Sequence, residues 1–302
     1  MPVSRALLLG TAVVVCLSCA SGAGQAASHP TTAWQLTAIG VDGAWSLSRG
    51  EGETIAFIDS GLDASRLPEL GRRVVKSVDL VGDGSADDLG HGTGVAAAAA
   101  AAGDLGVWGV APRASLLIAR VASAGHVPQP ADVAAGIRWA LTNGATVINL
   151  SLGTPRDEPA IASAIGVALA AGVVVVAAGG DTLGSAPLFP ASMPGVLSAR
   201  AVDREGTPGP RANPLAAGGL DVPGIDIPSL SIETSNAAPT PSLISGSSIA
   251  AAVLSGAVAL IESCSQRMGH RAGMTDILRA LRESATDRPV FQLSTAMRSV
   301  GC

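Results

Sequence analysis

Short apolar runs alternate with longer segments of helical periodicity along most of this chain. Five Val-, Ile-, Leu- and Ala-rich runs end in turn-forming residues and have the length of buried strands, at 53–61, 115–121, 146–153, 172–180 and 195–202. The segments 90–103, 130–144 and 158–172 carry helical patterns, and each ends in glycine. Doubly buried strands that alternate with helices predict an α/β fold with three αβα layers and a mainly parallel central sheet.

The last 100 residues change in character. Residues 205–245 are rich in Pro, Gly and Ser and have weak periodicity, which indicates irregular strands and surface loops. The stretch 243–263 then leads from Gly246, Ser247 and Ser248 into a long apolar helix pattern. We find no internal repeat, and we predict one domain over residues 28–302 with no recognisable prodomain.

The first 27 residues have the pattern of a secretory signal peptide. Arg5 precedes an apolar run at 6–20, and small residues follow at 21–27. The pattern predicts export with cleavage, either into the medium or into the cell envelope. Lipidation at Cys19 and an uncleaved anchor remain alternatives, so contact with a membrane is expected only through the signal or a lipid.

Composition narrows the function further. The chain is 48% hydrophobic and 14% charged, with a net charge of −5 and Lys76 as its only lysine. Nucleic-acid binding would need clustered basic residues, so we exclude nucleic acid as a partner. We expect the protein to be a monomer. Outside the signal the cysteines are Cys264 and Cys302, which an oxidising compartment would allow to pair. Two free thiols are the alternative.

Three polar residues stand where strands end or helices begin. Asp59 ends the first strand and precedes Ser60 and Gly61, a sequence that a simple turn would also explain. His91 lies between glycines at the start of a helix, although histidine is not a favoured cap. Ser248 begins the closing helix, where it is either a cap or a nucleophile beside free backbone N–H groups.

Asp59, His91 and Ser248 occur in that order, and with this order the chain resembles the subtilisin-like serine peptidases. The resemblance covers nearly the whole chain after the signal. It is carried by "WQLTAIGVDGAW", "IDSG", "GHGTGVA", "GVAPRASLLIARV", "INLSLG", "AAGVVVVAAGGD", "FPAS", "DVPG" and "SGSSIAAAVLSGAVAL". It implies a serine endopeptidase in which Ser248 is the nucleophile, His91 transfers the proton and Asp59 orients the imidazole.

The resemblance also implies where a peptide substrate would bind. One edge of the substrate site would be Ser151, Leu152 and Gly153, and the opposite edge would include Gly125. Residues 177–179 would line the primary pocket. A protein or peptide substrate would lie between these edges as an added strand.

One departure from the family pattern affects the chemistry. Alignment without a gap places Asp181 where the family has an asparagine that donates to the oxyanion, and Gly180 falls there only after a one-residue deletion. An ionised Asp181 has no proton to donate, whereas a protonated one could donate. We therefore expect weakened or pH-shifted turnover. The alternative is a catalytically impaired protein that binds peptides as a scaffold.

We expect no cofactor. Calcium is frequent in the family, but we identify no ligand set here, and Asp83, Asp87 and Asp88 fit a solvated acidic loop better than an ion site. An α/β-hydrolase with Ser248 as nucleophile fails on residue order, since its acid and histidine must follow the serine at suitable places. The short interval after residue 27 also leaves no room for the propeptide that many secreted members carry.

Overall fold

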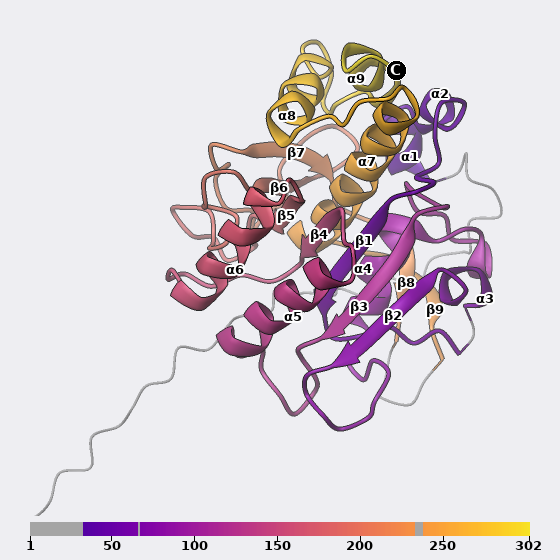
Figure 1. Ribbon diagram of the computed structural model, residues 1–302. Helices are drawn as coiled ribbons and strands as arrows, with labels where there is room; N and C mark the ends of the chain where they lie inside the picture. The colour runs from indigo at the N-terminus through magenta and orange to yellow at the C-terminus, as the bar shows by residue number, and fades with distance from the viewer. Residues whose placement is uncertain (1–32, 66, 233–237) are drawn as a thin grey trace, which may run out of the picture.

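The computed structural model describes residues 33–65, 67–232 and 238–302; the predicted signal at 1–27, with Cys16 and Cys19, lies outside them. At its centre is a seven-stranded parallel sheet (Figure 1). Its strands, in spatial order, are β2 (Val74–Asp79), β3 (Ser115–Arg120), β1 (Thr54–Asp59), β4 (Val147–Leu150), β5 (Val174–Ala178), β6 (Leu197–Val202) and β7 (Gly219–Pro223). An antiparallel pair consists of β8 (Ile227–Ser231) and β9 (Thr240–Ile244).

Helices cover both faces of the sheet, as Figure 1 shows. One face carries α5 (Pro130–Thr142) and α6 (Pro159–Ala170), and the other carries α4 (His91–Ala100) and α7 (Ser247–Arg267). The remaining helices are α1 (Trp34–Ala38), α2 (Val41–Trp45), α3 (Pro68–Gly71), α8 (Met274–Glu283) and α9 (Leu293–Ser299), with a short 3₁₀ turn η2 (Asp104–Gly106).

The side chains of β1 show why the sheet is covered twice. Ile55 and Phe57 pack into the apolar cluster that includes α4 and α7, whereas Ala56 and Ile58 pack into the cluster that includes α5 and α6. Successive residues of a strand point to opposite faces, so an uninterrupted apolar run requires two apolar layers. The predicted three-layer αβα fold is confirmed.

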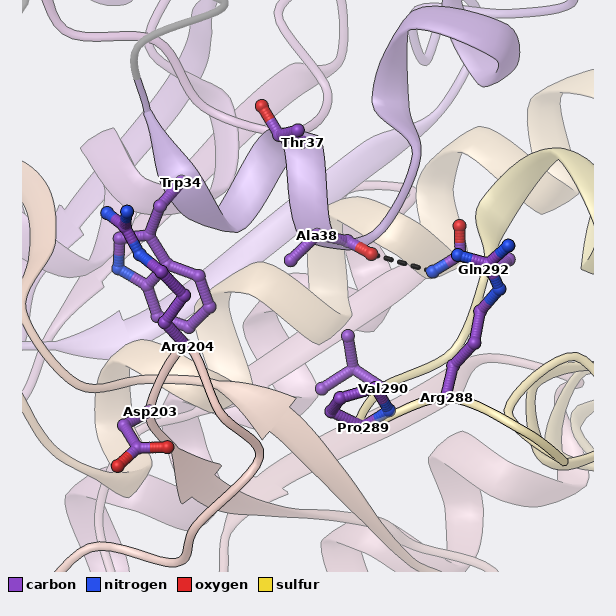
Figure 2. Close-up of a pocket in the computed structure, with 9 residues that line it drawn as sticks. All are labelled: Trp34, Thr37, Ala38, Asp203, Arg204, Arg288, Pro289, Val290 and Gln292. Carbon is purple, nitrogen blue, oxygen red and sulfur yellow. Dashed lines mark hydrogen bonds between the residues drawn. The ribbon is translucent and has the colours of Figure 1, made fainter.

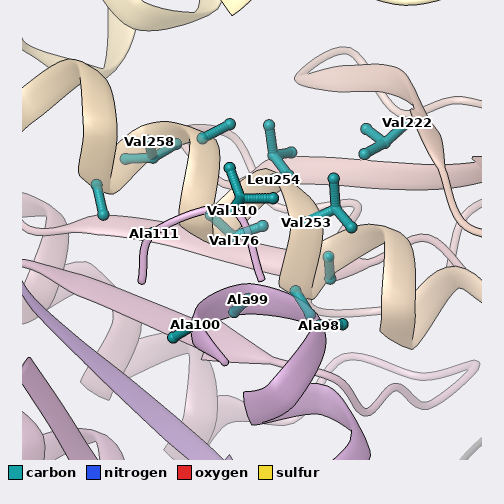
Figure 3. Packing of buried hydrophobic residues seen from close by; sticks show 14 of the residues in the cluster. Ala98, Ala99, Ala100, Val110, Ala111, Val176, Val222, Val253, Leu254 and Val258 are labelled. Carbon is teal, nitrogen blue, oxygen red and sulfur yellow. The ribbon is translucent and has the colours of Figure 1, made fainter. Parts of the chain in front are cut away.

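Small residues bring α4 and α7 close together. Figure 3 shows Ala98, Ala99 and Ala100 of α4 beside Val253 and Leu254 of α7. A Cβ on Gly256 of α7 would lie 2.8 Å from the carbonyl oxygen of Ala99, which is closer than a side chain tolerates. The alanine run thus forms a thin contact layer, and α7, the one described helix long and apolar enough to span a membrane, is a buried core helix.

The edge strand β2 was not among the predicted strands. Its residues 75–77 are exposed, and they combine Val75, Lys76 and Ser77 rather than forming an apolar run. An edge strand of a doubly covered sheet is solvated along one side, so the buried-strand pattern is absent from it. The strands β7, β8 and β9 all lie within the segment 205–245 that was predicted to contain irregular strands and loops.

Two carboxyl groups are buried at the far end of α7. Glu53 and Glu262 are each 0% exposed, and they lie close enough together for each to influence the pKa of the other. Arg271 Nε donates to Glu262 Oε1 at 3.3 Å, but Glu262 Oε2 and both oxygens of Glu53 have no hydrogen-bond partner in the described part of the chain. Burial raises the pKa of both residues, that of Glu262 to about 8, so the pair holds at least one proton at neutral pH.

Candidate active site

The fold brings the predicted polar residues to one edge of the sheet. Asp59 is the last residue of β1, which lies between β3 and β4. His91 is the first residue of α4, and Ser248 is the second residue of α7. Ser151 directly follows β4. In parallel sheets ligands bind beyond the carboxyl ends of the strands, and all four residues lie at or face that edge.

Asp59 and His91 are in direct contact. Nδ1 of His91 lies 2.7 Å from Oδ1 of Asp59, and the same oxygen accepts the backbone N–H of Ser60 at 2.7 Å. Both side chains are buried, with 5% of Asp59 and 7% of His91 exposed. A carboxylate can only accept, so Nδ1 is the donor and Nε2 of the neutral ring carries the lone pair.

The surroundings of His91 favour its charged form. Burial lowers the pKa of His91, but the charge of Asp59, its hydrogen bond and the charge of Asp87 raise it, and the net result is a pKa above the ordinary 6.5. Stabilisation of an imidazolium is what a histidine that accepts a proton during a reaction requires.

Asp87 holds the turn that carries His91. Its Oδ1 accepts the hydroxyl of Ser60 at 2.8 Å and the N–H of Gly90 at 2.9 Å. Its Oδ2 accepts the N–H of Thr93 at 2.8 Å and the hydroxyl of Thr93 at 2.7 Å. Burial raises the pKa of Asp87, and the hydrogen bonds from Thr93 and Ser60 lower it. The net result is a pKa above the ordinary value of an aspartate. The sequence favoured a solvated acidic loop over an ion site for Asp87, and the loop prediction is wrong for this residue: its side chain is 5% exposed and caps α4.

The two neighbouring aspartates bind an arginine. Asp83 pairs with Arg120 at 2.6 Å and Asp88 at 3.0 Å, while Asp79 completes the group at 3.2 Å. Burial lowers the pKa of Arg120, but its hydrogen bonds to the carboxylates raise the pKa by more. The net result is a pKa above the ordinary value of an arginine. The carboxylate oxygens of these loop aspartates are therefore bound to protein donors: Arg120 for Asp83 and Asp88, and the turn before α4 for Asp87. A set of carboxylates bound in this way does not fit a calcium site. Among the described residues no group of three or more His, Cys, Asp or Glu side chains could hold a metal ion.

Ser248 is tied to the end of β4. Its hydroxyl donates to the carbonyl oxygen of Ser151 at 3.2 Å, and the Ser151 hydroxyl donates to the carbonyl oxygen of Ser248 at 2.9 Å. Across residues 33–65, 67–232 and 238–302, Nε2 of His91 is buried without a hydrogen-bond partner. The Ser248 hydroxyl is therefore not bonded to His91. A buried polar atom without a partner is uncommon and points to a functional use.

Asp181 lies against the start of α7. Its Oδ2 accepts the backbone N–H of Ser247 at 2.7 Å and the hydroxyl of Ser247 at 2.8 Å. The Ser247 hydroxyl in turn accepts the N–H of Gly180 at 3.1 Å. Gly246, the N-cap, has φ +145°, a conformation that favours glycine. Within the described segments no serine side chain caps the helix, and Asp181 does so from another segment.

The residues expected to bind substrate lie as follows. Ser151, Leu152 and Gly153 follow β4, and the Leu152 side chain is buried in the cluster beneath α5 and α6, so only its backbone faces the edge. Gly125 lies in a tight turn between Ser123 and His126, and no atom of the described residues lies within 4 Å of a Cβ placed on it. Gly125 is thus open on its side-chain face, as a cleft edge would be.

Cys264 and Cys302 form a disulfide, with their Cα atoms 6.0 Å apart. It links the end of α7 to the last residue of the chain across 38 positions. The structure therefore has the paired cysteines and not the alternative of two free thiols.

Figure 2 shows a pocket away from these residues. It has a volume of about 490 Å³ and lies between α1 and the segment before α9. Arg204 lies over the ring of Trp34 at 5.8 Å, and Gln292 donates to the carbonyl oxygen of Ala38 at 2.6 Å. None of the residues predicted for chemistry lines it, so we do not assign the active site to this pocket.

Comparison with known proteins gives a family match over most of the chain. The family model described as "Subtilase family" matches residues 50–300. Thermitase of Thermoactinomyces vulgaris is 36% identical over 165 residues, which cover 53% of this chain and 59% of that protein. Subtilisin BL of Lederbergia lenta is 33% identical over 215 residues, covering 70% of this chain and 77% of that protein.

Some relatives are considerably longer than the part that this chain matches. An alkaline protease of Alkalihalobacillus alcalophilus is 32% identical over 215 residues, but the match spans 54% of its length. The solved structure of the prenylagaramide maturation protease PagA superposes with a TM-score of 0.72 and 27% identity, covering 86% of this chain and 98% of that one. With the sheet, its helices and the family match over residues 50–300 in agreement, the chain belongs to the subtilase family.

Proposed function

We propose that this chain is an exported serine endopeptidase in which Ser248, His91 and Asp59 form the catalytic triad. The observation that carries the proposal is the buried pair of His91 and Asp59, in contact at 2.7 Å, with Nε2 of His91 lacking a partner among the described residues. Ser248 is the second residue of α7, whose start faces the same sheet edge. Export is supported by the signal pattern at residues 1–27.

The reaction would begin with a rotation of the Ser248 side chain. Its hydroxyl would leave the carbonyl oxygen of Ser151 and donate to Nε2 of His91. As Oγ attacks the carbonyl carbon of the peptide, Nε2 takes the hydroxyl proton and later gives it to the leaving amine. Water then attacks the acyl-enzyme while Nε2 takes one of its protons, and the same nitrogen returns that proton to Oγ as the acyl bond breaks and the acid product leaves. Asp59 stabilises the imidazolium in both halves, in line with the raised pKa of His91.

The negative charge on the substrate oxygen would be met by the start of α7. Ser248 is the second residue of that helix, so its N–H has no carbonyl partner within the helix and lies at the positive end of the helix dipole. Oδ2 of Asp181 is engaged with Ser247 at 2.7 and 2.8 Å and donates to neither. We expect the oxyanion site to work with fewer donors than the family pattern supplies.

The substrate is proposed to be an extended protein or peptide segment. It would add as a strand between residues 151–153 and the turn that contains Gly125, held by main-chain hydrogen bonds. The names of the relatives, which include proteases and a maturation protease, support this class of substrate.

A second candidate is a peptide-binding protein that has lost turnover. It is favoured by one observation, the Asp181 carboxylate at the place where a donor is expected. Under this alternative, replacement of Ser248 would leave the biological activity intact.

The direct test is hydrolysis of a general protein substrate such as casein by wild-type protein and by Ser248→Ala, from about pH 5 to 9. The proposal predicts wild-type hydrolysis that falls at least about a thousandfold in the variant. Equal and negligible hydrolysis by both proteins at every pH would favour the peptide-binding candidate.

A further inference from the structure

A leucine lies between two glycines beside the proposed nucleophile. A Cβ on Gly153 would lie 3.0 Å from Cβ and 3.1 Å from Cδ1 of Leu188. A Cβ on Gly180 would lie 2.8 Å from Cγ and 3.0 Å from Cδ1 of the same leucine. Because carbon atoms pack at about 3.5–4.0 Å, Leu188 fills the space that both glycines leave open.

Both glycines belong to segments that start at the reaction centre. Gly153 is two residues after Ser151, whose carbonyl oxygen accepts the Ser248 hydroxyl. Gly180 precedes Asp181, and its N–H donates to the hydroxyl of Ser247. The space between the two segments therefore opens next to Ser248, and Leu188 occupies it.

The backbone holds Leu188 in this position. Its N–H donates to the carbonyl oxygen of Gly179 at 2.9 Å, and its carbonyl oxygen accepts the N–H of Ser192 at 2.9 Å. The next residue, Phe189, exchanges two hydrogen bonds with Thr154, at 2.8 and 2.9 Å. Leu188 cannot withdraw without breaking these bonds.

Leu188 is also distinct from the ordinary core. Its side chain is only 6% exposed, yet it is a member of neither apolar cluster formed by the described residues. Its neighbours are the two glycine-containing segments. A buried leucine that packs on the two glycine-containing segments rather than in an apolar cluster is placed to limit what else can enter the space between them.

We infer that Leu188 determines specificity by closing the pocket for the substrate side chain next to the cleaved bond, which restricts that side chain to Gly, Ala or Ser. This inference rests on the proposed function. It adds that the substrates are proteins or peptides cleaved after small residues. Exclusion acts through a steric clash, and even one methylene in an apolar pocket changes kcat/KM by about 10- to 200-fold.

The first experiment uses the wild-type protein. Two p-nitroanilide peptides, succinyl-Ala-Ala-Pro-Ala and succinyl-Ala-Ala-Pro-Phe, differ only in the side chain at the cleaved bond. We expect kcat/KM to be at least about 100-fold higher for the alanine peptide. Labelling of Ser248 by a small fluorophosphonate, which carries no such side chain, is measured in parallel.

The second experiment enlarges the pocket. Leu188→Ala should raise the Phe-to-Ala ratio of kcat/KM at least about tenfold, and Leu188→Val should raise it less. Leu220→Ala in β7 is the matched control, because Leu220 is a leucine with the same 6% exposure that lies in the core cluster. It should leave the ratio unchanged.

The outcomes separate the two levels of the proposal. Labelling of Ser248 together with equal cleavage of both peptides, or with an unchanged ratio in folded Leu188→Ala, overturns the role of Leu188 and leaves the proposed function standing. If Leu188→Ala does not fold, the role of Leu188 is judged from the Phe-to-Ala ratio of kcat/KM in the wild type and in Leu188→Val. Absence of both labelling and cleavage overturns the proposed function, and the role of Leu188 with it.

Discussion

Oδ2 of Asp181 accepts both the backbone N–H and the hydroxyl of Ser247, the residue directly before Ser248, at 2.7 and 2.8 Å. The carboxylate thus stabilises the start of α7 while a negative charge stands near the proposed oxyanion site. A carboxylate at a helix N-terminus contributes about 0.5–2 kcal/mol to stability. The same group would oppose the charge that develops during peptide hydrolysis, so stability and turnover conflict at this position.

Asp181→Asn should increase turnover. The amide keeps an oxygen that can accept from Ser247 and gains an N–H that can donate to the oxyanion, which is worth about a hundred- to thousandfold in kcat. Steady-state kinetics on the alanine peptide measure this, with exposed Asp276→Asn as the control. An unchanged kcat in folded Asp181→Asn would show that residue 181 does not face the oxyanion.

Asp59→Asn should reduce kcat by about ten-thousandfold, because an amide no longer holds Nδ1 of His91 as the donor. The pH dependence carries further information. His91 must be neutral to accept a proton, so wild-type kcat/KM should rise with pH through a midpoint above 6.5.

Loss of the Asp59 charge should move that midpoint to lower pH in the residual activity of Asp59→Asn, since burial alone lowers the pKa of His91. A pH profile with the same midpoint in both proteins would mean that another group controls the titration.

The buried pair of Glu53 and Glu262 predicts alkaline destabilisation. The pKa of Glu262 is about 8 in the folded protein and near its ordinary 4.5 when unfolded, so the folded state binds the extra proton. Its stabilising effect is complete below about pH 4.5 and is lost as pH rises through about 8. Urea unfolding at about pH 6 and 9 should show a loss on the order of 3 kcal/mol.

Glu262→Gln should remove most of this pH dependence, because the amide is neutral at every pH. Glu51→Gln, a change at a partly exposed glutamate, should retain it. An equal slope of unfolding free energy with pH in wild type and Glu262→Gln would contradict the assignment.

The disulfide of Cys264 and Cys302 should stabilise the protein without taking part in chemistry. Closing 38 positions accounts for at most about 4 kcal/mol. Cys302→Ser should lower the thermal midpoint, and a reductant should lower that of the wild type to the same value. Two titratable thiols in the untreated folded protein would show that the pair does not form.

Much of this arrangement is readable from the chain. The runs that became β1 and β3 to β6 are apolar on both faces, which only a doubly covered strand tolerates. The contact of His91 with Asp59 was expected from the family resemblance, since nothing local links residues 32 positions apart. The strand β2 was not predicted, because its edge position leaves residues such as Lys76 exposed to solvent and so removes the apolar pattern of a buried strand.

The interactions that modify the site could not be predicted from local pattern. Asp181 reaches Ser247 across 66 positions only because β5 and α7 pack side by side. The local sequence around Asp83 and Asp88 is typical of a solvated loop. Their ion pairs with Arg120 of β3 depend on the folded chain, since Arg120 is more than 30 residues away. Leu188 lies in a segment without periodicity, so its place between Gly153 and Gly180 emerges only from the folded chain.

Covalent labelling tests the central claim most directly. Folded protein is treated with a fluorophosphonate, digested and mapped by mass spectrometry, with Ser248→Ala and His91→Ala treated alongside. The account predicts a single adduct on Ser248 that both variants abolish. Recovery of the Ser248 peptide without an adduct, or an adduct that persists in His91→Ala at the wild-type rate, would contradict it.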